Sequence, residues 1–290
     1  IRDAYASIDK ALEHCSAHLS CDIDLNWIDT TNIDNSNVAP RLADLHAVIV
    51  PGGFGSRGVE GKIACVRHCR ENGLPYLGLC LGFQMAVIEF ARNVLGLKDA
   101  NSTEFKPGCE NPVISELPEQ KRIEGLGGTM RLGGQEVAIT PNSLAHFLFN
   151  KQHGVRERFR HRYEVDPNYV ERFEHAGLVF SGRHPARPIM QILELRQSIS
   201  EIDHPAASIR SSAGTSHEGG LALKVTHPYF IGAQFHPELT SRPLRPQPMF
   251  MGLVAAAIVR RIGRDQALLD AEVSRWLRPV SSARPQPQTV

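Results

Sequence analysis

One stretch of the sequence decides the fold: Leu74-Pro-Tyr-Leu-Gly-Leu-Cys80-Leu-Gly-Phe-Gln84. An apolar run leads into Cys80, a glycine stands two residues to either side of it, and apolar residues at helical spacing continue to Leu95. This order predicts a strand, a sharp turn and a helix, with Cys80 on the turn. The pattern is the thiol form of the nucleophile elbow, and a helix N-terminus favours the reactive thiolate. The alternative is an inert core cysteine beside chance glycines.

The composition describes an ordinary globular chain. It has 290 residues, 42% of them hydrophobic, and a net charge of +1. With so little charge and no apolar run near the ~20 residues that span a bilayer, we expect neither a nucleic-acid nor a membrane partner. The six cysteines are spread along the chain and do not suggest a disulfide framework. A reducing, cytoplasmic setting is therefore expected.

Cys65 and Cys69, with His68 between them, are the one hint of a metal site. Their spacing lies inside a helical pattern, and no second pair of ligands accompanies them. We therefore interpret them as helix residues and expect no metal.

Helices and buried strands alternate along the first hundred residues. Apolar spacing predicts helices over residues 3–19, 62–72 and 81–95, and strands over 23–28, 45–50 and 74–79, with a loop at 30–41. The fold class is therefore α/β: a doubly wound, mostly parallel central sheet flanked by helices. Such folds usually open with a strand. Because this chain opens with a helix, we hypothesise that its first strand is missing and that the chain is a fragment.

The remaining sequence extends the same domain. Further strands are expected near residues 129–132, 162–165, 178–183, 189–195 and 230–235, and helices over 169–175, 249–262 and 265–277. Residues 198–220 are rich in Ser, His and Gly and are interpreted as a surface insertion. Residues 278–290 are interpreted as a disordered tail. One domain over residues 1–277 is the expected organisation.

A cysteine nucleophile needs a base, and the base needs an orienting group. His236 follows the predicted strand 230–235, at the sheet edge where α/β folds place ligands. Glu238 stands two residues on and can accept the imidazole N–H. Cys80, His236 and Glu238 together predict a thiol triad for acyl transfer. By itself, the His-Pro-Glu run is also compatible with a simple strand-end turn.

An oxyanion hole is expected from two backbone N–H groups. One is that of Leu81, directly after the nucleophile. The other belongs to the glycine-rich loop Pro51–Gly55, where Gly53 allows close approach. A phosphate cradle is the competing interpretation of that loop, but it lacks the Gly-Lys-Ser/Thr ending of a P-loop and the spacing of a dinucleotide fingerprint.

These motifs resemble those of class I, triad-type glutamine amidotransferases. The longer runs at residues 51–63, 100–105, 128–133, 160–165 and 236–243 look like the glutaminase domain of CTP synthase. The resemblance covers about residues 2 to 262, apart from the 198–220 insertion. One departure is Phe83, where this family usually has methionine.

The resemblance implies a role for each matching residue. Cys80 would attack the side-chain amide of L-glutamine and form a thioester, with His236 relaying protons and Glu238 orienting it. Glutamine carries an α-ammonium and an α-carboxylate, which suit an acid and a base respectively. Residues expected to hold glutamine are Gly53, Phe54, Leu81, Gly82, Phe83, Gln84, Glu104, Arg162 and Tyr163.

The resemblance also implies chemistry outside this chain. In the family, ammonia passes to an N-terminal synthetase (amidoligase) domain that uses ATP and Mg²⁺ to aminate UTP to CTP, with GTP as activator and a homotetramer as the assembly. No P-loop is present here, and we expect no cofactor in this domain. Alternatives are a stand-alone γ-glutamyl hydrolase, another amidotransferase glutaminase, or a catalytically silent regulatory module.

Overall fold

The structure is a computed structural model that describes residues 2–116, 130–196, 198–200, 222–224 and 227–262. The predicted helix at 265–277, the tail at 278–290 and most of the 198–220 insertion lie outside the described residues.

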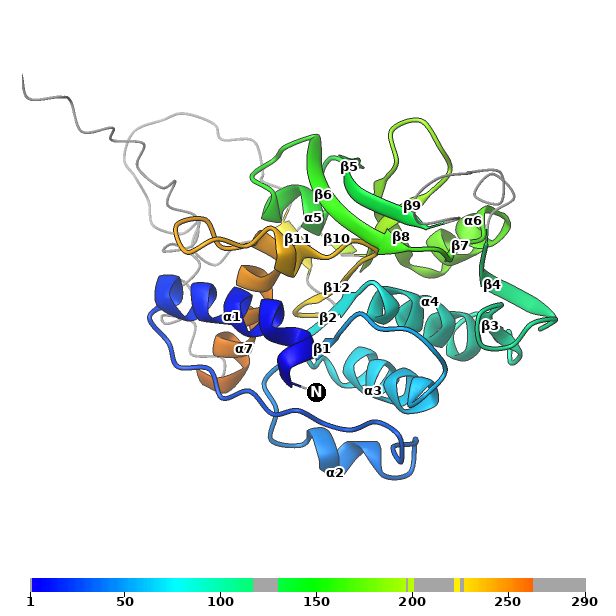
Figure 1. Cartoon of the computed structure of the whole chain (residues 1–290), viewed down its shortest axis with the longest axis horizontal. Coiled ribbons are helices and arrows are strands. Elements are labelled where there is room, and N and C mark those ends of the chain that lie inside the picture. The colour runs from blue at the N-terminus through cyan, green and yellow to red at the C-terminus, as the bar shows by residue number, and fades with distance from the viewer. Residues whose placement is uncertain (1, 117–129, 197, 201–221, 225–226, 263–290) are drawn as a thin grey trace, which may run out of the picture.

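Helices and strands follow the predicted order over most of the chain (Figure 1). The helices are η1 (Arg2–Tyr5), α1 (Ala6–Leu19), α2 (Val38–Leu42), α3 (Val59–Asn72), α4 (Leu81–Asn93), α5 (Leu144–Leu148), α6 (Pro167–Ala176), η4 (Pro237–Leu239) and α7 (Pro248–Ile262). The strands are β1 (Val48–Val50), β2 (Tyr76–Leu79), β3 (Ala100–Ser102), β4 (Asn111–Ser115), β5 (Arg131–Ile139), β6 (Gly154–His161), β7 (Glu164–Val165), β8 (Leu178–Arg183), β9 (Met190–Leu195), β10 (Ser198–Ser200), β11 (Ala222–Lys224) and β12 (Phe230–Ala233). Within these ranges, no helix has the length and apolar character needed to cross a membrane.

A seven-stranded sheet forms the centre, in the order β1-β2-β12-β9-β8-β5-β6. The α/β prediction is confirmed, but the expected mostly parallel pairing holds only where β2 lies between β1 and β12. The pairings β12-β9, β9-β8, β8-β5 and β5-β6 are antiparallel. The connection from β8 to β9, residues 184–189, is too short for a parallel crossover, which needs a dozen or more residues.

Helices cover both faces of the sheet (Figure 1). On one face α3 and α4 pack over β1 and β2. On the other α1, drawn in blue, lies beside α7, drawn in orange. Strand β2 shows why both faces are covered: Tyr76 belongs to the first apolar cluster, and Leu77 and Leu79 belong to the second. Alternate side chains of a strand point to opposite faces, so an apolar run must be buried on both.

Two local predictions differ from the structure. Residues 23–28 are not a strand, although Ile23 and Leu25 pack against one apolar cluster and Ile28 against the other. The alternation of apolar and polar residues here reflects side chains buried on two sides of the segment. The segment does not pair with any of the described strands. The expected loop at 30–41 contains the start of α2. The missing first strand stays a prediction; β1 is the edge strand of the sheet as described.

Candidate active site

Cys80 occupies the turn between β2 and α4, as predicted. Its backbone has φ 49° and ψ −95°, a conformation that costs an L-residue about 1–3 kcal/mol. Two hydrogen bonds hold the turn: the Cys80 N–H donates to the Ala233 carbonyl at 2.7 Å, and the Gln84 N–H donates to the Cys80 carbonyl at 3.2 Å. This turn places the thiol at the N-terminus of a thirteen-residue helix, whose positive end favours a thiolate.

The flanking glycines are required by close packing. A Cβ on Gly82 would lie 2.0 Å from the Val50 carbonyl oxygen, and one on Gly78 would lie 2.8 Å from the Gly82 carbonyl carbon. Strand β1, strand β2 and helix α4 therefore meet with no room for a side chain at either position. The two glycines of the elbow motif are explained by this packing.

His236 and Glu238 lie next to each other at the end of β12. The His236 Nδ1 and Glu238 Oε1 atoms are 2.7 Å apart. The His236 N–H donates to the Arg158 carbonyl at 2.8 Å, which ties the residue to β6. A Cβ placed on Gly52 would meet both His236 Cε1, at 2.8 Å, and Cys80 Cβ, at 3.4 Å. The three residues of the predicted triad are thus brought together across Gly52.

The electrostatics of His236 suit a partner for a thiol. Burial lowers its pKa, but the Cys80 sulfur and the Glu238 carboxylate outweigh burial and raise the pKa to about 10. The imidazole is therefore a cation at neutral pH, and such a neighbour favours the thiolate form of a cysteine. Its Nε2 atom is buried and has no hydrogen-bond partner among the described residues.

A cavity of about 270 Å³ opens above Cys80. Seven of the predicted glutamine contacts line it together with Cys80: Gly53, Phe54, Leu81, Gln84, Glu104, Arg162 and Tyr163. Three residues that were not predicted complete the lining: Met130, Arg160 and His161. The elbow loop, the Pro51–Gly55 loop and the end of β6 therefore converge on one space.

An acid and a base face this cavity, as the predicted recognition of an amino acid requires. The Gly55 N–H donates to Glu104 Oε1 at 3.3 Å. Burial raises the pKa of the Glu104 carboxyl, and this hydrogen bond and the charge of Arg162 oppose the rise. At the rim, Phe54 is 63% exposed and lies under the Arg160 guanidinium, 5.7 Å from the ring centre.

Gly82 and Phe83 do not contribute side chains to the cavity. Phe83 is fully buried, with its ring centre 6.4 Å from that of Phe180. Gly82 faces Val50. Their role in binding glutamine stays a prediction. If they bind it, they do so through their backbone groups.

Two buried polar residues near the nucleophile were not predicted. Gln234 Nε2 lies 3.8 Å from the Cys80 sulfur, and Gln234 Oε1 accepts a hydrogen bond of 3.2 Å from Gln84 Nε2. His161 Nδ1 lies 3.1 Å from the Tyr163 carbonyl oxygen, and burial lowers the His161 pKa to about 3. His161 therefore stays neutral. The available signal was position: Gln234 precedes the His-Pro-Glu run by two residues, and His161 lies in the run at 160–165.

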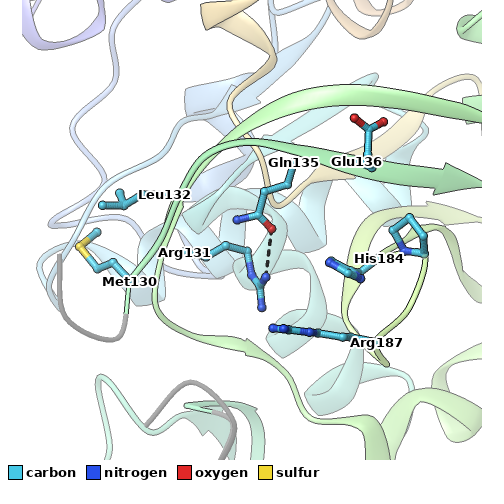
Figure 2. Close-up of a pocket in the computed structure, with 8 residues that line it drawn as sticks. Met130, Arg131, Leu132, Gln135, Glu136, His184 and Arg187 are labelled. Atoms are coloured by element: carbon cyan, nitrogen blue, oxygen red, sulfur yellow. Dashed lines mark hydrogen bonds between the residues drawn. The ribbon is translucent and has the colours of Figure 1, made fainter. Parts of the chain in front are cut away.

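A second hollow, of about 570 Å³, lies between β5 and the β8–β9 connection (Figure 2). Arg131, His184 and Arg187 point into it, and Arg131 Nη1 donates to Gln135 Oε1 at 3.0 Å. Its lining has no thiol or hydroxyl side chain, so it lacks the cysteine or serine nucleophile that a triad for acyl transfer uses. Across the described ranges, no group of His, Cys, Asp and Glu is arranged to hold a metal ion. The cavity over Cys80 is the candidate active site.

Comparison with known proteins agrees with this geometry. The family profile described as glutamine amidotransferase class-I matches residues 1–205. CTP synthase of Archaeoglobus fulgidus is 45% identical over 90% of this chain and 43% of its own length. CTP synthase of Thermus thermophilus is 44% identical over 88% of this chain and 42% of its own length. The chain spans less than half the length of these curated relatives.

A solved structure matches over most of its length. The glutaminase domain of the Trypanosoma brucei CTPS, with bound acivicin, superposes with a TM-score of 0.72 and 32% sequence identity. The match covers 88% of each chain. The likeness is therefore to one domain of a larger protein and extends over most of that domain.

Proposed function

This chain belongs to the class-I glutamine amidotransferase family, together with the glutaminase domain of CTP synthase, and from that premise we propose that it hydrolyses L-glutamine through Cys80, His236 and Glu238. The observation that carries the proposal is the strained elbow cysteine on the floor of a cavity that also holds Glu104 and Arg162. An acid and a base above one nucleophile suit a free amino acid.

In the proposed first step, the Cys80 thiolate attacks the side-chain amide carbon of glutamine. The developing oxyanion is stabilised by the backbone N–H groups of Gly53 and Leu81. Support for this pairing is that a Cβ on Gly53 would lie 3.4 Å from Leu81 Cδ2, so the two loops adjoin. His236 gives its proton to the departing nitrogen, the C–N bond breaks, and ammonia leaves behind a glutamyl thioester.

In the second step, the now neutral His236 takes a proton from water. The resulting hydroxide attacks the thioester, the C–S bond breaks, and glutamate leaves as the thiolate and the imidazolium are restored. Glu238 keeps the imidazole oriented in both steps through the 2.7 Å contact with Nδ1. Glutamine binding is assigned to Glu104 for the α-ammonium and Arg162 for the α-carboxylate.

We assign the ammonia to the larger protein of which this domain would be a part. Its curated relatives are CTP synthases more than twice as long as the match, so a synthetase domain is the proposed acceptor site. There ammonia would aminate UTP to CTP with ATP and Mg²⁺ under GTP activation, in a homotetramer. These steps rest on family membership alone.

Ammonia and glutamate release from L-glutamine tests the proposal. Cys80→Ala should abolish release, because no nucleophile remains, while Cys21→Ala, a cysteine outside the cavity, should retain it. Acivicin should add covalently to Cys80, as seen in the mass of the Cys80 peptide. Hydrolysis of γ-glutamyl peptides in preference to glutamine would support a γ-glutamyl hydrolase. If the protein neither hydrolyses glutamine nor is labelled at Cys80, with GTP present or absent, the result would support a catalytically silent module.

A further inference from the structure

We propose that Glu157 is a positioning residue of the catalytic triad, holding the turn that carries Glu238 against His236. The proposal rests on the function proposed above. Glu157 lies on β6, is 4% exposed, and does not line the cavity over Cys80. A carboxylate buried to this extent needs a reason, because burying an ionisable group is costly unless it is hydrogen-bonded.

The contacts of Glu157 all lead to the segment after His236. Thr240 Oγ1 donates to Glu157 Oε2 at 2.8 Å, directly after η4, the turn that contains Glu238. Gln247 Nε2 donates to Glu157 Oε1 at 3.2 Å, directly before α7. The orientation of the Gln247 amide is fixed, because its Oε1 accepts the Met249 N–H at 2.7 Å. Glu157 therefore joins β6 to both ends of the segment 240–247.

The backbone of β6 holds the same region from the next residue. The Arg158 carbonyl accepts the His236 N–H at 2.8 Å. One strand thus fixes the base through its backbone and the orienting turn through a side chain. The distance between His236 Nδ1 and Glu238 Oε1 therefore depends on both links, the backbone bond from Arg158 and the side-chain bond from Glu157.

The protonation state of Glu157 changes how the turn is bonded. Thr240 Oγ1 lies 2.8 Å from Glu157 Oε2 and 3.0 Å from the Pro237 carbonyl oxygen, but a hydroxyl has one proton to donate. When Glu157 is ionised, that proton must go to the carboxylate. When Glu157 is protonated, it can itself donate to Thr240, and the hydroxyl proton is free for Pro237. The bond that closes the turn is therefore linked to one proton on β6.

The burial of Glu157 places this change close to neutral pH. Burial raises the pKa of Glu157 to about 7, with a further contribution from the Glu238 charge, while Thr240, Gln247 and Arg245 act in the opposite direction. Its register partner on β5, Gln135, is uncharged. On the side of α1, His14 Nδ1 lies 2.9 Å from the Ser241 hydroxyl, next to this turn. Above pH 7 a second negative charge therefore appears behind the triad.

Three variants and a matched control test the proposal. Glu157→Gln fixes a neutral side chain of the same shape, Thr240→Val removes the hydroxyl, and Glu157→Ala removes the whole link. Glu136→Gln is the control, because Glu136 lies on the neighbouring strand, is exposed and, among the described residues, forms its salt bridge with the exposed Arg156. Glutaminase kcat and KM, and the rate at which iodoacetamide alkylates Cys80, are measured from about pH 5.5 to about pH 8.5.

The expected results separate positioning from mere stability. Glu157→Ala and Thr240→Val should lower kcat about tenfold with KM changed less than about twofold, because Glu104 and Arg162 are untouched. Glu157→Gln should lose an inflection near pH 7 that the unsubstituted protein and Glu136→Gln both show, in kcat and in alkylation. Superimposable pH profiles for Glu157→Gln and the unsubstituted protein would overturn the proposal.

The design also separates the two proposals. If the unsubstituted protein fails to hydrolyse glutamine, the proposed function fails, while the pH profile of Cys80 alkylation still reports on Glu157. If Glu157→Ala does not fold, Glu157→Gln and Thr240→Val decide the outcome, since each keeps the number of heavy atoms in the side chain and leaves no cavity. A rise in KM together with a fall in kcat, both in proportion to a fall in thermal stability, would assign Glu157 a structural role only.

Discussion

The substitution Gly52→Ala should damage catalysis although it replaces no reacting group. An added Cβ would lie 2.8 Å from His236 Cε1 and 3.6 Å from His236 Nδ1. The imidazole cannot easily move away, because Glu238 holds its Nδ1 and Arg158 holds its backbone N–H. The clash must therefore displace the base from Cys80 or shift the Pro51–Gly55 loop.

The size of the effect follows from the overlap. The contact to Cε1 is about 0.6 Å shorter than the 3.4 Å at which ordinary contacts begin. Because a misplacement of about 1 Å in an active site can cost about 100-fold in rate, we expect kcat to fall between about tenfold and 100-fold. That range corresponds to about 1.4–2.7 kcal/mol in the activation free energy. Overpacking also lowers the free energy of unfolding, by about 1–3 kcal/mol.

Steady-state glutaminase kinetics and thermal unfolding measure the two effects separately. KM should change little if the clash displaces His236, since no atom of Glu104 or Arg162 is among the nearest atoms that the added Cβ would meet. Gly154→Ala is the matched control, because its Cβ would meet only the Val137 carbonyl oxygen, at an ordinary 3.6 Å. If Gly52→Ala retained kcat within about twofold of the control, the triad would not be as tightly packed as this reasoning requires.

Two further predictions concern stability. Gly82→Ala should destabilise the fold by about 1–3 kcal/mol or more in denaturant unfolding, because its Cβ would overlap the Val50 carbonyl oxygen at 2.0 Å; stability equal to that of Gly154→Ala would refute the close packing of α4 on β1. His161, whose pKa falls to about 3 in the folded state from an ordinary 6.5, binds its proton more readily when unfolded, so between those values it makes stability rise with pH. His161→Gln should reduce the slope of unfolding free energy against pH in that window by up to about 1.4 kcal/mol per pH unit, and an unchanged slope would contradict a buried neutral imidazole.

The elbow could be predicted from the sequence because its signals lie within one short stretch. The glycine at 78 is required by contacts with Tyr76 and Gly82, a few residues away, whereas the glycine at 82 is required by Val50 on β1. The helix that follows runs from Leu81 to Asn93, within two residues of the predicted end. Its position at the sheet edge follows from the β2–turn–α4 order alone.

The pairing of the sheet could not be predicted in the same way. Strand β12 lies between β2 and β9 and pairs in parallel with the first and antiparallel with the second. Nothing in the apolar run at 230–235 indicates which neighbour pairs in parallel and which antiparallel. A strand buried on both faces has the same apolar pattern in either case. Residues 23–28 mislead for a related reason: alternation records which side chains are buried, not whether a ladder exists.

Helical periodicity sorts the residues after Cys80 more finely than the family motif does. Leu81 and Gln84 are three apart, so they share one face of α4, and both line the cavity. Gly82 and Phe83 lie on other faces of α4. Gly82 packs against Val50, and Phe83 packs against Phe180. A motif carried over residue by residue treats all four alike, although only residues three or four apart on a helix can face one ligand. The same logic applies on β6, where period-two alternation turns Glu157, Phe159 and His161 inward and leaves Arg156, Arg158 and Arg160 exposed. The inward carboxylate and imidazole on that strand are therefore part of the catalytic centre's support, which a search for nucleophile and base alone does not find.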